Sequence, residues 1–93
     1  MKKTILVTGA SSGIGLHIAT RLHETGYHVI GTSRNPEKYQ NKMPFKLLKL
    51  DISDDNSVDL FVKKFFTEVA HLDVLINNAG YLVRGLAEET AIE

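Results

Sequence analysis

Gly9, Gly13 and Gly15 lie where a short apolar run gives way to an amphipathic pattern. The run Thr4-Ile5-Leu6-Val7 is typical of a buried strand, and the helix-like pattern begins at Gly13. A strand that turns through glycines into a helix directs backbone N–H groups and the positive end of the helix dipole at one point. Glycine suits such a turn because it adopts positive φ and has no Cβ to hold an anion away. The stretch from Thr8 to Gly15 therefore predicts an anion-binding turn, whose commonest occupant is a nucleotide pyrophosphate.

The spacing of these glycines is Gly-x3-Gly-x-Gly, which differs from the Gly-x-Gly-x-x-Gly of the commoner dinucleotide fingerprint. A plain tight turn between strand and helix is the alternative interpretation. The strand before the glycines and the helix after them favour phosphate binding. A P-loop is disfavoured, because no Lys-Ser or Lys-Thr pair follows Gly15 to meet β- and γ-phosphates.

The end of the second expected strand bears on the choice of dinucleotide. A NAD-specific site places an acid there, about 20 residues past the glycines, to accept from the ribose 2′-hydroxyl. This chain has Ser33-Arg34 at that point and no acid before Glu37. The planar guanidinium of Arg34 could bind a 2′-phosphate bidentately, and Ser33 could add a hydrogen bond. The sequence favours NADP(H) over NAD(H), with an ordinary surface arginine as the alternative.

Strands and helices alternate along the chain. Apolar, β-branched runs predict strands at residues 3–8, 27–33, 45–52 and 72–76, and helical periodicity predicts helices at 13–25, 36–41 and 54–70. A further helical segment is expected to begin at Leu86, with Thr90 as a possible cap. Alternation of this kind predicts right-handed crossovers and an α/β fold with a parallel sheet. The doubly wound order would be 3-2-1-4, with a ligand crevice between the first and fourth strands.

Two of the expected helices have clear apolar faces and caps. Ile14, Ile18, Ala19 and Leu22 are expected on one buried face of the first, which Ser11 or Ser12 would cap. Ser53 is expected to cap the third. Its apolar stripe, typical of a helix packed on a sheet, consists of Val58, Phe61, Val62, Phe65, Phe66 and Val69.

Polar side chains follow the third and fourth strands. Asp51 could accept from an adenine amino group, or cap the next helix less well than Ser53. The amides of Asn77-Asn78-Ala79-Gly80 could tie this loop to the glycine turn or meet a ribose hydroxyl, and a plain turn is the alternative. The four histidines are not at metal-ligand spacing, so no metal site is expected.

Composition narrows the class of protein. The chain has 93 residues, 43% hydrophobic and 24% charged, as in an ordinary small globular domain. The absence of cysteine excludes disulfides and thiolate metal sites. Residues 1–50 carry eight Lys/Arg against two Asp/Glu, but these are scattered singly, which disfavours nucleic-acid binding. No apolar run approaches the roughly 20 residues of a membrane span. A cytoplasmic protein that binds neither nucleic acid nor membrane is expected.

Taken together, these motifs resemble the short-chain dehydrogenase/reductase family in its NADP-preferring form. The resemblance runs from about Thr4 to the last residue and implies an N-terminal half of a doubly wound Rossmann fold. It implies that Arg34 meets the 2′-phosphate and that Asp51 and Ile52 flank the adenine. Asn77, Asn78, Ala79 and Gly80 would lie by the adenosine or the nicotinamide ribose. The residues implied to line the pyrophosphate and ribose are Gly9, Ser11, Ser12, Gly13, Ile14 and Gly15.

The family's catalysts are a further Asn, a Ser and a Tyr-x-x-x-Lys pair. None of Tyr27, Tyr39 and Tyr81 is followed four residues later by lysine. The expectation is therefore that residues 1–93 form an NADP(H)-binding half-domain, truncated at the C-terminus and without catalytic residues. The parent oxidoreductase would interconvert a carbonyl and an alcohol, and this chain alone would be inactive.

The alternative is a stand-alone, non-catalytic nucleotide-binding or self-associating module. A half-sheet would leave the fourth strand as an exposed apolar edge and some helix faces uncovered. Self-association through either surface is expected.

Overall fold

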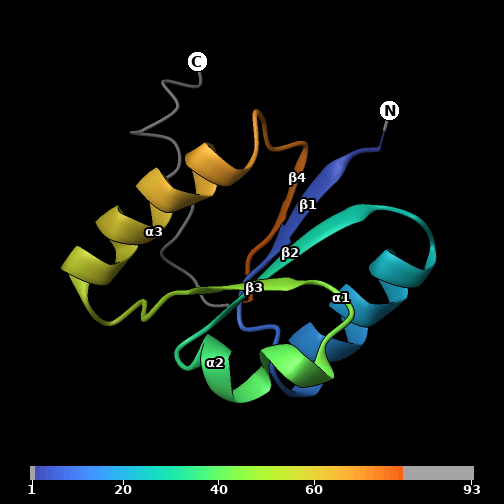
Figure 1. The fold of residues 1–93 in the computed structure, drawn as a ribbon, viewed down its shortest axis with the longest axis horizontal. Coiled ribbons are helices and arrows are strands. Elements are labelled where there is room, and N and C mark those ends of the chain that lie inside the picture. The colour runs from blue at the N-terminus through green and yellow to red at the C-terminus, as the bar shows by residue number, and fades with distance from the viewer. Residues whose placement is uncertain (1, 79–93) are drawn as a thin grey trace.

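The computed structural model describes residues 2–78, which form an α/β fold around one parallel sheet (Figure 1). The strands pair in the order β3-β2-β1-β4, and every pair is parallel. The predicted α/β class and the order 3-2-1-4 are confirmed. In chain order the elements are β1 Thr4–Val7, α1 Gly13–Glu24, β2 His28–Ser33, α2 Pro36–Tyr39, a 3₁₀ turn Gln40–Lys42, β3 Lys46–Lys49, α3 Asp55–Glu68 and β4 Val74–Ile76.

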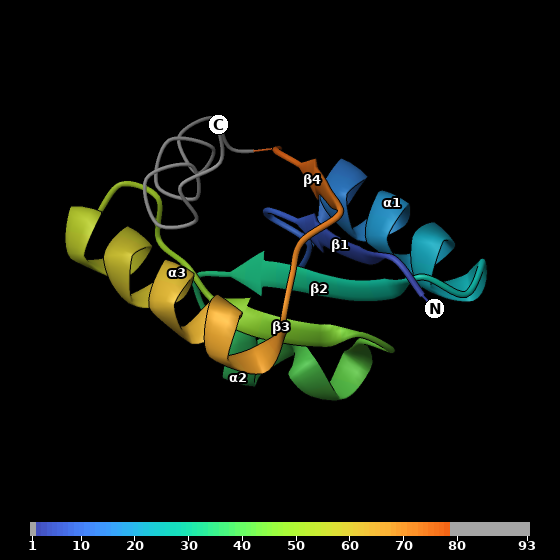
Figure 2. The same cartoon turned by 90° about the horizontal axis from the view of Figure 1, so that it is seen from above.

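Helices cover both faces of the sheet, α3 on one and α1 with α2 on the other (Figure 2). Alternate strand residues point to opposite faces, so each strand contributes to both cores. Leu6, Ile30 and Leu48 pack against the α3 stripe, in which Phe61 and Phe65 are fully buried. Burying one such aromatic side chain contributes about 1.5–3 kcal/mol. The opposite core, under α1 and α2, contains Ile5, Val7, Ala10, Ala19, Val29, Phe45 and Leu47.

The buried face of α1 differs from the prediction. Ile14 is 72% exposed, so its placement on the buried face was wrong. Gly15 and Ala19 are buried and Leu22 is half-buried, at spacings of four and three residues. Ile18 is also half-buried, so the predicted face holds except in its first turn, where Gly15 is buried in place of Ile14. Gly15 has no side chain, so the apolar pattern did not include it. The lack of a side chain at this position allows the helix to approach the turn.

The start of α3 also differs from the prediction. Asp54, not Ser53, is the N-cap, and its Oδ1 accepts a hydrogen bond of 3.0 Å from the backbone N–H of Asn56. Ser53 donates from both its N–H and its hydroxyl to Oδ1 of Asp51. That local turn removes residues 51–53 from the sheet. It explains why β3 ends at Lys49 rather than at residue 52 and why the helix begins one residue later.

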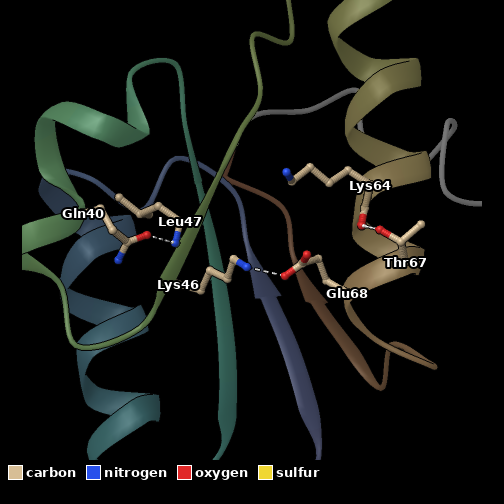
Figure 3. Close-up of polar contacts among 6 residues, drawn as sticks. All are labelled: Gln40, Lys46, Leu47, Lys64, Thr67 and Glu68. Atoms are coloured by element: carbon tan, nitrogen blue, oxygen red, sulfur yellow. Dashed lines mark hydrogen bonds and ion pairs between the residues drawn. The ribbon is translucent and has the colours of Figure 1, made fainter.

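The outer edge of β3 is covered by a side chain from the 3₁₀ turn. Oε1 of Gln40 accepts from the backbone N–H of Leu47 at 2.7 Å, and Nε2 donates to the carbonyl of Phe45 at 2.9 Å (Figure 3 shows the first bond). The amide thus takes the place of a peptide group of a neighbouring strand. Unpaired strand edges promote association with other chains, so Gln40 protects this edge.

We expect Gln40→Ala to lower the free energy of unfolding by about 1–2 kcal/mol, because one backbone donor and one acceptor lose their partner. Gln40→Glu is the matched control. Its carboxylate can accept from Leu47, but its second oxygen would face the Phe45 carbonyl as acceptor against acceptor, so the part of the loss that comes from Phe45 should remain. Urea denaturation measures both variants. A midpoint for Gln40→Ala equal to that of the wild type would contradict the edge-protecting role.

A second contact joins β3 to α3. Lys46 forms an ion pair with Glu68 at the end of α3 (Figure 3). The hydrogen bond from Lys46 lowers the pKa of Glu68.

Among residues 2–78, no helix is long and apolar enough to cross a membrane.

Candidate nucleotide-binding site

All four parallel strands end at the same edge of the sheet, and the glycine turn lies there between β1 and α1. Gly9 and Gly13 both have positive φ, 65° and 60°. At Gly13 an added Cβ would meet nothing within 4 Å, so the space above this residue is open. The turn thus has the backbone conformation predicted from its glycines, with an open surface at Gly13.

The third glycine is required for close packing. A Cβ on Gly15 would lie 2.1 Å from the carbonyl oxygen of Gly9 and 3.2 Å from Nδ2 of Asn78. The first turn of α1 therefore rests directly on the backbone of the glycine turn. This contact places the N-terminus of α1 at the end of β1.

The hydrogen bonds of the turn divide its N–H groups into two sets. The N–H of Gly9 donates to Oγ1 of Thr32 at 3.0 Å, and that of Ala10 donates to the Thr32 carbonyl at 2.9 Å. Within the described part of the chain, the N–H groups of residues 11–15 have no hydrogen-bond partner. Ser12 is the N-cap of α1, but its hydroxyl makes no capping bond. The second set is available to an anion at the positive end of the helix.

A pocket of about 380 Å³ joins the glycine turn to the ends of β2 and β3. It brings together seven of the predicted site residues: Gly9, Ser11, Ser12, Ser33, Arg34, Asp51 and Ile52. Thr32, Leu50 and Ser53 complete its lining. Gly13, Ile14 and Gly15 lie in the adjoining turn and first turn of α1 and do not line this pocket. Ala79 and Gly80 lie outside the described residues.

The carboxylate of Asp51 is held in place by its neighbours. The Ser53 hydroxyl donates to Oδ1 at 2.6 Å and the Ser53 N–H at 3.1 Å, while the N–H of Asp51 donates to Oγ of Ser57 at 2.9 Å. The bonds from Ser53 lower the pKa of Asp51 below its ordinary value of 3.8, and the charges of Arg34 and Lys49 lower it further. Among the described residues, Arg34 nevertheless forms no ion pair.

We expect Ser53→Ala to raise the pKa of Asp51, because the first cause of its lowering is removed. A carboxylate whose pKa is lowered in the folded state adds stability at any pH above its unfolded-state pKa. That stability is lost as the pH falls through the folded-state pKa. The difference in unfolding free energy between wild type and Ser53→Ala should therefore be present near pH 7 and shrink below about pH 3.8. Carboxyl NMR titration, with urea denaturation at each pH, measures both effects. A difference independent of pH would contradict this role of Ser53.

The end of β4 is tied to the glycine turn through Thr8, which is fully buried. The N–H of Thr8 donates to the carbonyl of Ile76, and its hydroxyl accepts from the N–H of Asn78 at 2.7 Å and donates to Oδ1 of Asn77 at 3.5 Å. The predicted tie between the loops is thus present. Asn77 makes it through its side-chain amide, and Asn78 makes it through its backbone N–H. The part played by Thr8 and Thr32 was not predicted, because their partners lie far away in sequence.

The fold and this site define a nucleotide-binding α/β protein of the Rossmann type. A family model described as short chain dehydrogenase matches residues 3–93. The chain belongs to the short-chain dehydrogenase/reductase family, whose members are oxidoreductases that bind a nicotinamide dinucleotide.

Individual proteins show the same relationship. The chain is similar to the 3-ketodihydrosphingosine reductase of Bacteroides thetaiotaomicron, 43% identical over 84 residues that cover 90% of this chain and 30% of that protein. A short-chain dehydrogenase structure from Streptomyces avermitilis matches with a TM-score of 0.74 and 35% identity, over 86% of this chain and 31% of the other. A metagenomic short-chain oxidoreductase in complex with NADP matches with a TM-score of 0.71 and 31% identity, over 84% and 39%. The chain thus spans between 30% and 39% of the length of these proteins.

Proposed function

We propose that residues 1–93 form the NADP(H)-binding part of an oxidoreductase that interconverts a carbonyl and an alcohol. The observation that carries the proposal is the pocket that Arg34 and Ser33 line together with the glycine turn and Asp51. Its donor set suits a dinucleotide phosphate. As far as residues 2–78 show, the N–H groups at the helix N-terminus are unpaired and the Arg34 guanidinium has no ion pair, and there is open space at Gly13. The relatives that bear the name reductase support the reaction class.

Each part of the site has a role in this proposal. The N–H groups of residues 11–15 would bind the pyrophosphate, with the hydroxyls of Ser11 and Ser12 beside them. Arg34 and Ser33 would bind the 2′-phosphate. Asp51 and Ile52 would flank the adenine, with Oδ1 of Asp51 held by Ser53 and Oδ2 left to accept a hydrogen bond. When bound, the cofactor supplies the hydride, and this chain's residues hold and orient it.

Asn77, Asn78, Ala79 and Gly80 are proposed to lie along the ribose side of the same cofactor. A preference for NADP(H) over NAD(H) follows from Arg34 and from the absence of an acid between β2 and Glu37. An acid at the end of β2 would repel a 2′-phosphate, whereas Arg34 attracts it. A similar short-chain oxidoreductase has been solved in complex with NADP, which supports the binding of a nicotinamide dinucleotide here.

Calorimetric titration of this chain with NADPH and NADH tests the proposal. We expect NADPH to bind at least about tenfold more tightly, because a charge-assisted pair is worth about 1.5–3 kcal/mol. Equal affinities would contradict the coenzyme preference, and failure to bind either would contradict the function.

We also propose that this chain alone does not oxidise NADPH with ketones, since it contains no Tyr-x-x-x-Lys pair. Ketone-dependent NADPH oxidation would refute that part.

We further propose that the chain self-associates through the edge of β4. Within residues 2–78, β4 pairs only with β1, and Val74 is 38% exposed. An open apolar strand edge favours pairing with another chain. Light scattering should show dimers or larger species, and a monodisperse monomer would contradict this. The expected cytoplasmic location and lack of nucleic-acid binding stay predictions.

A further inference from the structure

Thr32 is a buried polar residue near the end of β2, only 2% exposed. Both of its oxygen atoms are used on the glycine turn. Oγ1 accepts from the N–H of Gly9 at 3.0 Å, and the carbonyl accepts from the N–H of Ala10 at 2.9 Å. Two successive N–H groups of the turn are therefore bound by one residue of the neighbouring strand, 22 and 23 positions away.

These two bonds have a consequence for the N–H groups that follow. A turn with Gly9 at φ 65° and Gly13 at φ 60° has other conformations of similar energy, because glycine is permissive. Binding the N–H groups of Gly9 and Ala10 restricts these other conformations at the start of the turn. In the observed conformation, the N–H groups of residues 11–15 donate to no residue among 2–78. The bond to Gly9 needs the Thr32 hydroxyl, because the Thr32 carbonyl is bound to Ala10.

We propose that Thr32 is a positioning residue for the dinucleotide phosphates. Both of its oxygen atoms accept from the glycine turn, so its role is exerted through the turn and not as a phosphate ligand. It acts by holding the glycine turn in the conformation that binds the pyrophosphate before the ligand arrives. Ligand affinity falls by the fraction of molecules whose site is preformed, so loosening the turn weakens binding. This inference rests on the proposed dinucleotide binding, and one of its tests needs no ligand.

The first test measures amide hydrogen exchange in the protein without ligand. The amides of Gly9 and Ala10 should exchange slowly and those of Ser12 and Gly13 rapidly. Thr32→Val should speed the exchange of Gly9 and leave Ala10 protected, because the carbonyl remains. Rapid exchange of Gly9 in the wild type would overturn the inference, whether or not the protein binds a dinucleotide.

The second test compares two ligands. Thr32→Val should weaken NADPH binding about tenfold, as expected for the loss of one hydrogen bond in the site. Binding of adenosine 2′-phosphate should stay unchanged, since that ligand has the 2′-phosphate but no pyrophosphate. Thr32→Ser keeps the hydroxyl and should restore NADPH affinity. If Thr32→Val acted only by disturbing the packing, it would weaken the binding of both ligands. Thr32→Ser, which loses the methyl group, would then weaken NADPH binding as well.

The outcomes separate the two claims. An unchanged NADPH affinity in Thr32→Val, an equal loss for both ligands, or a failure of Thr32→Ser to restore affinity would each overturn the positioning role. If the wild type bound no dinucleotide while its Gly9 amide stayed protected, the proposed function would fail and Thr32 would have no phosphate to position. If Thr32→Val did not fold, the exchange rates of the wild type and the affinities of Thr32→Ser would still decide.

Discussion

Replacing Arg34 with alanine is expected to weaken NADPH binding by about ten- to a hundredfold and to leave NADH binding unchanged. The guanidinium lines the pocket beside Ser33 and Asp51 and forms no ion pair within the described residues, so it is available to a phosphate. A charge-assisted bidentate contact is worth about 1.5–3 kcal/mol. NADH has no 2′-phosphate, so its binding does not include this contact. Calorimetric titration of the wild type and of Arg34→Ala with both dinucleotides measures the effect.

The matched control is Arg21→Ala, which removes the same charge from the exposed last turn of α1. It should leave both affinities unchanged, which separates a local contact from a change in net charge. Arg34→Lys keeps the charge but not the planar fork, and its loss should be smaller than that of alanine. An equal loss of NADPH and NADH affinity in Arg34→Ala would show that Arg34 supports the fold of the pocket and does not select the coenzyme.

Much of this fold could be predicted because its signals are local. The stripe of α3 spans Val58 to Val69 and repeats at helical spacing, so periodicity alone predicted which face is buried. The sheet order followed from the alternation of strands and helices, since right-handed crossovers leave few parallel topologies. Ile14 shows where such reasoning fails. The apolar pattern placed it on the buried face, but Gly15, which packs against the Gly9 carbonyl, takes the buried position in the first turn of α1 and leaves Ile14 exposed.

The grouping of candidate site residues in one place was predicted, their roles stay predictions, and the contacts among them were not predicted. Motif spacing brought Ser11, Ser12, Arg34 and Asp51 to one pocket, as the structure has them. The contacts that hold the pocket join residues whose proximity is known only after folding. Thr32 binds Gly9 across 23 positions, and no local pattern marks a strand threonine as a partner of a turn. Serine is a residue type that often caps helices, but the Ser53 hydroxyl donates to the carboxylate of Asp51, two residues earlier, and does not cap α3.

Replacing Gly15 with alanine is expected to be the most destabilising change in the glycine turn. The new Cβ would lie 2.1 Å from the Gly9 carbonyl oxygen, a backbone atom that cannot move without displacing the turn. Overpacking of this kind costs about 3 kcal/mol. For a domain of this size that loss lowers the melting temperature by more than about 10 °C. Thermal unfolding followed by circular dichroism, without ligand, measures it.

Gly13→Ala is the matched control, because it adds the same methyl group to the same turn. Its Cβ would meet nothing within 4 Å, so the only cost is the positive φ of 60°, about 1–2 kcal/mol. Gly13→Asn should cost less, since asparagine tolerates this conformation better than alanine. The two glycines are therefore required for different reasons, Gly15 for the approach of α1 to the turn and Gly13 for its backbone angle. Equal losses in Gly13→Ala and Gly15→Ala would contradict the close contact between α1 and Gly9, and with it the placement of the helix N-terminus at the end of β1.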